Sequence, residues 1–201
     1  MTCRGPPAGW RCSLSELSLR AAAAFAIIAF LLTAVMGAAI VVASPETGRQ
    51  FIQIVKDEVL GKVDAHDPLS LAVFIFANNL QACILLFLGG ATLGLLTLVI
   101  IASNGIIIGG IMELVREERG LLFVAAAILP HGIFEIPSFL ISASLGFILG
   151  ASLYAEARGE GDSAATAMAH ARTFLLVVVP LVAIAAFIEA FITPQIIQLV
   201  S

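Results

Sequence analysis

Long apolar runs alternate with short polar segments along this chain, and the lengths of those runs predict its architecture. A helix needs about 20 successive apolar residues to cross the hydrocarbon core of a bilayer. Five runs meet that requirement. They predict an all-α, polytopic transmembrane helical bundle with spans at about 21–43, 70–89, 91–114, 121–153 and 173–193. Residues 1–20 would form a polar N-terminal segment, and 21–201 a single transmembrane domain.

The connector after the first span, 44–69, has a helical pattern of its own. Ser44 can cap a helix that has Pro45 in its first position. Apolar residues then recur at helical spacing, at Phe51, Ile52, Val55, Val59 and Val63. The pattern predicts an amphipathic helix that lies on the membrane or packs on the protein's own spans.

The fourth run, 121–153, is too long for one straight span. At about 1.5 Å per residue it would extend about 50 Å, whereas the hydrocarbon core is about 30 Å thick. Pro130 and Pro137 lie inside it, and proline removes a backbone donor and clashes with the preceding turn. We therefore expect a broken or re-entrant helix, with a half-helix at 121–129, a break near 130 that includes Gly132, and a longer helix beyond.

Polar residues on this longer helix share one face. At about 100° per residue, His131, Glu135, Ser138 and Ser142 fall within a stripe about 60° wide. An ionisable residue inside a membrane costs a few kcal/mol and is a candidate for a functional site. The same stripe is also compatible with a structural role, in which His131 and Glu135 bind one another and neighbouring amides. The sequence leaves both interpretations open.

Other spans carry isolated polar residues. Asn78 and Asn79 lie in the second span, and Asn104 precedes Gly105 in the third, where this pair could mark a local break in the helix. Amides inside a membrane commonly bind other helices, so they indicate either packing contacts or a polar pathway. Glu189, near the end of the last span, could lie at the interface or join a central polar cluster.

Glycine pairs spaced four residues apart recur in these spans and predict close approach of helix backbones. The pairs are Gly90 with Gly94, Gly105 with Gly109, and Gly146 with Gly150. Such faces can pack inside one bundle or between two copies. We expect a homodimer through these close-packed faces.

Composition supports the membrane assignment and excludes other classes. The chain is 60% hydrophobic and 12% charged, whereas soluble domains carry about 25% charged residues. Its formal charge of −4, without a long basic run, excludes nucleic acid as a partner. The three cysteines lack metal-ligand spacing. Arginine and lysine are spread evenly over the connectors, so orientation is not determined, although three arginines before the first span favour an inside N-terminus.

Three stretches resemble the motifs of the stage II sporulation protein M family of membrane proteins. They are "FANNLQACILLFLGGATLG", "ASNGIIIGG" and "LPHGIFEIPSFLISASLGFILG", and the likeness covers roughly 70–153. The family's Pro-His-Gly and following Glu correspond to Pro130, His131, Gly132 and Glu135. Its asparagines correspond to Asn78, Asn79 and Asn104, the last followed by Gly105. The family commonly has Pro-Ala after the Glu, where this chain has Pro137 and Ser138.

The resemblance implies a multi-pass protein of the cell membrane. In spore-forming bacteria the family's namesake resembles a scaffold that holds peptidoglycan-degrading partners. We therefore expect a non-enzymatic scaffold or organiser, with lipid, a second copy and cell-envelope proteins as partners. The alternative is a transporter, channel or ion-binding protein with an intramembrane site at His131 and Glu135.

An intramembrane hydrolase is the least favoured interpretation. His131 and Glu135 alone are too few to hold a catalytic metal, and neither an HExxH motif nor a GxSxG motif is present. We expect no enzyme activity and no cofactor, although a cation bound by His131 and Glu135 remains compatible with the sequence.

Overall fold

The computed structural model describes residues 18–46, 48–50, 53 and 67–200. Within these ranges the chain is helical and contains no strand. Five helical stretches are long and apolar enough to cross a membrane. They are α1 (Leu19–Ala43), α3 (Pro68–Leu88), α4 (Leu95–Arg119), α5 (Leu121–Ala157) and a final composite helix that spans Ser163–Gln198. The predicted fold class, an all-helical polytopic bundle, is confirmed.

Two predicted segments fall largely outside this description. Most of the polar N-terminal segment and most of the amphipathic connector belong to residues that the structure does not describe. The final helix begins at Ser163, ten residues before the predicted span at 173. Asp162 caps it by accepting a hydrogen bond from the backbone N–H of Ala165 at 2.9 Å.

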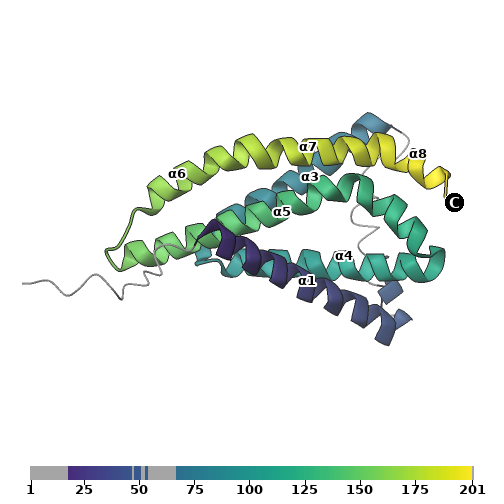
Figure 1. The fold of residues 1–201 in the computed structure, drawn as a ribbon, viewed down its shortest axis with the longest axis horizontal. Coiled ribbons are helices and arrows are strands. Elements are labelled where there is room, and N and C mark those ends of the chain that lie inside the picture. Colours follow the sequence, from purple (N-terminus) through teal and green to yellow (C-terminus); the bar gives the residue numbers. More distant parts are fainter. Residues whose placement is uncertain (1–17, 47, 51–52, 54–66, 201) are drawn as a thin grey trace, which may run out of the picture.

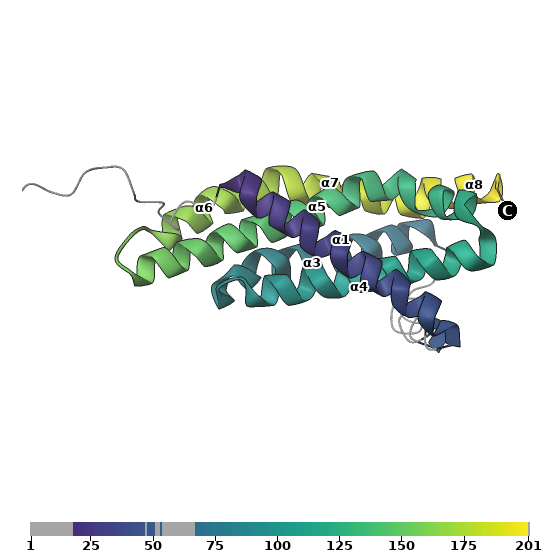
Figure 2. The ribbon, with the colours of Figure 1, turned by 60° about the horizontal axis from the view of Figure 1, so that its bottom comes forward.

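The central element of the bundle is α5, which packs against every other spanning helix. In Figure 1, α1 and α4 lie on one side of α5, and the final helix lies on the other. Figure 2 shows α1 running obliquely across the bundle. The interior is apolar, and its fully buried members include Leu86, Ile101, Leu145, Val178 and Val182.

Large apolar side chains also cover the outside of the bundle. On α1, Phe25, Leu32 and Val35 are exposed. In water such a surface would be an aggregation hazard, whereas a bilayer provides an apolar solvent for it. The outer surface therefore agrees with a membrane-spanning chain.

Close backbone approach joins α1 to α4. A Cβ atom at Gly109 would overlap the carbonyl oxygen of Ala34, and one at Gly105 would overlap Thr33 Oγ1. Gly37 on α1 packs in the same way on the carbonyl of Ile106. The predicted close approach thus takes place within the chain, so this glycine face is unavailable to a second copy.

A second close approach joins α5 to the end of α3 and to the turn after it, which includes η1 (Gly89–Thr92). A Cβ at Gly146 would overlap the carbonyl of Leu86, and one at Gly90 would overlap the carbonyl of Gly146. Gly150 packs equally closely on the backbone of Leu93. Gly94, which we expected on a packing face, lies in this contact, because a Cβ at Gly150 would be 2.8 Å from the backbone nitrogen of Gly94. Its φ of +86° also lets the chain begin α4 after a tight turn.

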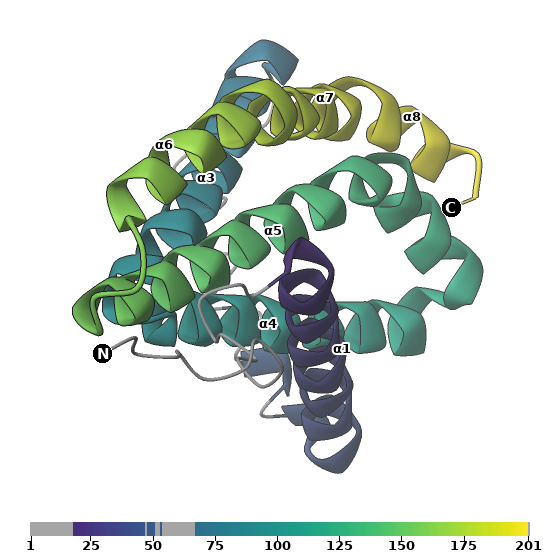
Figure 3. The same cartoon turned by 60° about the vertical axis from the view of Figure 1, so that its left-hand side comes forward.

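The fourth span is bent and not broken, so the predicted break near 130 is wrong. The structure has one continuous helix, α5, with Pro130 and Pro137 inside it. Figures 1 and 3 show that this helix bends sharply between its N-terminal part and its longer C-terminal part. Proline inside a helix produces such kinks because its ring displaces a preceding carbonyl. The bend shortens the span without a re-entrant segment at 121–129.

The predicted local break at Asn104 is wrong. The helix α4 is continuous from Leu95 to Arg119. The side-chain amide of Asn104 donates to the carbonyl oxygen of Ile100 at 2.9 Å, so this amide is satisfied by its own helix. Gly105 allows the close contact between α4 and α1, and it does not form a turn.

Two wide turns interrupt the final helix. After α6 (Ser163–Thr173), the π-helical segments η2 (Phe174–Val178) and η3 (Ile188–Ile192) flank α7 (Val179–Phe187), and α8 (Thr193–Gln198) ends the helix. Pro180 and Pro194 each lie two residues beyond a π segment. A π turn bonds i to i+5 and gives a proline ring room within an otherwise helical stretch.

Candidate functional site

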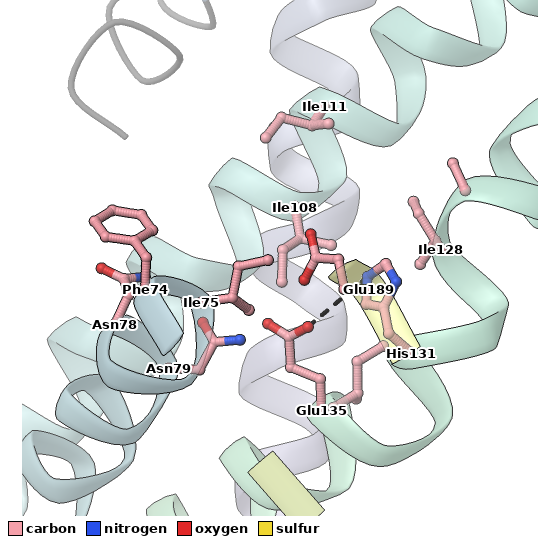
Figure 4. Close-up of a pocket in the computed structure, with 13 residues that line it drawn as sticks. Phe74, Ile75, Asn78, Asn79, Ile108, Ile111, Ile128, His131, Glu135 and Glu189 are labelled. Carbon is pink, nitrogen blue, oxygen red and sulfur yellow. Dashed lines mark ion pairs between the residues drawn. The ribbon is translucent and has the colours of Figure 1, made fainter. Parts of the chain in front are cut away.

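A cavity of about 360 Å³ opens among α3, α4, α5 and η3. Figure 4 shows polar side chains from three of these elements pointing into it. Asn79 and Ile108 lie near the middles of α3 and α4, which places the cavity near the midplane of the bundle. The lining residues are Phe74, Ile75, Asn78, Asn79, Ile108, Ile111, Ala127, Ile128, His131, Gly132, Glu135, Ile136 and Glu189.

Helix α5 contributes His131 and Glu135 to the site. Their spacing of four residues on α5 places both side chains on one face. The Nε2 atom of His131 lies 3.8 Å from Oε2 of Glu135. Both side chains are largely buried, with 13% and 18% of their surfaces exposed. They lie just beyond Pro130, in the part of α5 where a kink is expected.

Glu189 is a third member of the site, and it comes from the other end of the fold. The donor atoms of His131, Glu135 and Glu189 all lie within 4.8 Å of one another. Glu189 belongs to η3, whose wide turn departs from the regular helical register. The sequence left open whether this residue was interfacial or inward, and the structure places it inward.

Two further polar groups flank these three residues. Asn79, which is 8% exposed, points its side-chain amide towards the carboxylate of Glu135. On the opposite side, Nδ1 of His131 lies 3.5 Å from Oγ1 of the buried Thr193. Asn78 also lines the cavity, and it is an exposed residue of α3.

The remaining predicted site residues lie elsewhere. The hydroxyls of Ser138 and Ser142 are fully buried and donate to the carbonyls of Glu135 and Ser138 at 2.7 and 2.8 Å. Ser138 also lies 3.8 Å from the thiol of the buried Cys83. This part of the stripe is a packing surface between α5 and α3, whereas the part with His131 and Glu135 opens to the cavity. Asn104 does not line the cavity.

The electrostatics of the site favour a positively charged ligand. The carboxylates of Glu135 and Glu189 lie within 4.8 Å of each other, and none of the described residues that line the cavity is a lysine or arginine. Two like charges at that distance repel by on the order of 3 kcal/mol at an effective dielectric constant of about 20. A cation among the three donors would offset this repulsion.

Sequence reasoning identified His131, Glu135 and Asn79 but did not identify Thr193. The available signal for Glu189 was a charged residue in an apolar run, which is costly unless it faces the bundle interior. Thr193 gave little signal, because a threonine beside a proline at the end of a span is common in helix termini. Its contact with His131 depends on the position of the final helix.

Comparisons with known proteins agree with the span pattern. The model of the family described as Stage II sporulation protein M matches residues 26–194. One relative, an uncharacterized protein of Methanocaldococcus jannaschii, is 38% identical over 127 residues, which cover 61% of this chain and 70% of that protein.

A second uncharacterized protein of the same organism is 36% identical over 87 residues. The match covers 43% of this chain and 37% of that protein. No solved structure matches this chain.

Proposed function

Because the chain belongs to the stage II sporulation protein M family and spans a membrane, we propose that it is a cation-binding membrane protein that moves its ligand through the bilayer. The proposal places it in the cell membrane. His131, Glu135 and Glu189 would hold the cation, and the cavity would provide access to it.

One observation carries this proposal: three ionisable side chains converge within 4.8 Å at mid-depth in an apolar bundle. A purely structural pair would need only His131 and Glu135. The additional carboxylate of Glu189 makes the cluster more negative without adding an internal counter-charge, and this is costly unless a bound cation or a proton neutralises it.

The surrounding backbone also supports a transport role. Broken or irregular helices at mid-membrane are typical of transporter binding sites. Here the bent helix α5 contributes His131 and Glu135, and the π segment η3 contributes Glu189. Irregular segments of this kind absorb changes of backbone angle more readily than a regular helix, so both walls of the cavity are suited to opening and closing.

A non-enzymatic scaffold is the second candidate, and a face of α3 with exposed amides favours it. Asn78 and Gln81 are exposed there, near the middle of the span. Amides at that depth gain from hydrogen bonds to another transmembrane helix. We propose that this face, in place of the glycine faces, contacts a second copy in a homodimer. Neither candidate assigns a catalytic reaction to the chain.

Flux through proteoliposomes tests the first candidate. Purified protein would be reconstituted with cation-sensitive dyes inside, beside Glu135→Gln and Glu189→Gln. The exposed Glu118 on α4 supplies a matched control, Glu118→Gln. We expect both cavity variants to lose flux at least tenfold and the control to keep it. Absence of flux and of cation binding in the wild type, with an intact oligomer, would favour the scaffold.

A further inference from the structure

From the chemistry of the three donors we infer that the cavity binds a divalent first-row transition metal ion, of the Mn²⁺, Fe²⁺, Co²⁺ or Zn²⁺ class. The inference rests on the proposed cation-binding function and specifies its ligand. His131 would supply one nitrogen, and Glu135 and Glu189 one or two oxygens each.

The donor set distinguishes this class from other cations. Ca²⁺ and Mg²⁺ prefer oxygen ligands alone, whereas imidazole suits zinc, copper, iron and nickel. A combination of one imidazole and two carboxylates is typical of borderline metals. The site places an imidazole nitrogen beside a carboxylate, because Nε2 of His131 lies 3.8 Å from Oε2 of Glu135.

The charge of the site agrees with a divalent ion. A neutral imidazole and two ionised carboxylates have a total charge of −2. No lysine or arginine is present among the described lining residues to reduce this charge. A monovalent ion would leave one carboxylate uncompensated in an apolar surrounding, where that charge is costly unless the group also binds a proton. A divalent ion compensates both.

Thr193 supplies an independent indication of metal ligation. In metal sites the ring nitrogen that does not bind the metal usually donates to an oxygen, which fixes the tautomer and the ring orientation. Nδ1 of His131 lies 3.5 Å from Oγ1 of Thr193, on the side of the ring away from Glu135. This contact would keep the proton on Nδ1 and leave the Nε2 lone pair directed at the carboxylates.

The fit requires only small side-chain movements. Metal bonds to nitrogen and oxygen of about 2.0–2.2 Å imply donor atoms about 3–3.5 Å apart. The three donors are within 4.8 Å, so each must move by about 1 Å. His131 and Glu135 share one helix, and only Glu189 must approach from another. The cavity has space for water molecules, which would complete the coordination.

Titration with Co²⁺ tests the inference, because its visible absorption reports a nitrogen and oxygen coordination shell directly. The full chain in detergent would be titrated with Co²⁺ alone, with bound metal counted by equilibrium dialysis, and then challenged with excess Ca²⁺. We expect one Co²⁺ per chain that a hundredfold excess of Ca²⁺ fails to displace.

Two variants separate a ligand from an orienting residue. We expect His131→Gln to weaken Co²⁺ binding at least a hundredfold and to abolish the preference over Ca²⁺. Thr193→Val keeps the size of the side chain, and we expect it to weaken binding about tenfold while the absorption spectrum keeps its bands. His170→Gln serves as the histidine control, since His170 does not line the cavity, and binding should be unchanged.

The possible outcomes distinguish this inference from the proposed function. If wild type and His131→Gln bind Co²⁺ and Ca²⁺ equally, the metal assignment is wrong, whereas a cation site at the carboxylates stands. The same holds if flux of a monovalent or organic cation depends on Glu135 and Co²⁺ does not bind. If no cation binds and no flux is detected, both proposals fail.

Discussion

Glu135 and Glu189 bring their carboxylates within 4.8 Å of each other at mid-depth in the bundle, although they belong to different spanning helices. One lies on the kinked helix α5 and the other on the π segment η3. Their proximity turns an intramembrane His–Glu pair into a site with room for a cation. It also makes the site a source of instability when no ligand is bound.

Glu189→Gln should therefore stabilise the protein in cation-free buffer at pH 8. The substitution removes one of two repelling charges, and we expect a gain of about 1–3 kcal/mol in the free energy of unfolding. Thermal melting in detergent measures it, with Glu118→Gln as the exposed control.

Addition of the cation should reverse that order. A ligand at 1,000 times its dissociation constant stabilises the wild type by about 4.1 kcal/mol, which exceeds the advantage of the variant, whereas the variant should gain much less. Two results would contradict these predictions: a melting temperature of Glu189→Gln below that of the wild type without cation, and a melting temperature of the wild type that does not rise when the cation is added.

Gly109→Ala should loosen the contact between α1 and α4. The added methyl group meets the backbone carbonyl of Ala34, which cannot rotate away, and overpacking of this kind costs about 1–3 kcal/mol. The neighbouring Gly110 provides a matched control, because a Cβ there would lie 3.6 Å from the nearest atom, in Val41. Gly110→Ala should be neutral or stabilising by up to about 1 kcal/mol, since alanine favours a helix. Equal losses in both variants would exclude the proposed contact.

Thr97→Val tests the hydrogen bond between α4 and α3. Thr97 is fully buried, and its hydroxyl donates to the carbonyl of Leu86 at 2.8 Å. Valine has no hydroxyl to donate, so the buried carbonyl of Leu86 loses one hydrogen-bond partner. We expect the free energy of unfolding to fall by about 1–2 kcal/mol. Ser103→Ala is the comparison, because that exposed hydroxyl bonds only its own helix, at Val99. For Ser103→Ala we expect the free energy of unfolding to change by no more than about 0.5 kcal/mol.

Asn78→Leu combined with Gln81→Leu tests the proposed homodimer face on α3. Replacing exposed amides by leucine removes interhelical hydrogen bonds that are worth about 1 kcal/mol each in membranes. The two substitutions together remove about 2 kcal/mol, so we expect the dimer to dissociate at least about thirtyfold more readily, as counted by native mass spectrometry over a dilution series. The glycine control, Gly110→Ala, should leave the distribution unchanged. A wild type that is monomeric at every concentration would exclude this interface.

The spans could be predicted from sequence because their length and apolarity are set by the bilayer. The stripe on α5 was also predictable to a large extent, since a regular helix fixes which residues share a face. Ser138 and Ser142 are buried as the stripe implied, although their hydroxyls bind the backbone and not the site.

The remaining features depend on contacts between distant segments. Whether Pro130 breaks a helix or bends it is decided by the helices packed around it. A wide turn rotates every later residue relative to a regular helix, so η2 alters the register of Glu189 and η3 alters that of Thr193. Asn104 was misread because Asn-Gly marks turns in water, whereas inside an apolar helix the amide binds its own backbone.

The pairing of α1 with α4 has a consequence for biosynthesis. The ribosome makes about 5–20 residues per second, and both α3 and α4 follow α1 in the chain. For several seconds α1 therefore lies in the bilayer without α4, whose glycines pack against it. The seam formed by Gly37, Gly105 and Gly109 must therefore close after insertion, so the nascent first span depends on lipid or on the insertion machinery until its partner is made.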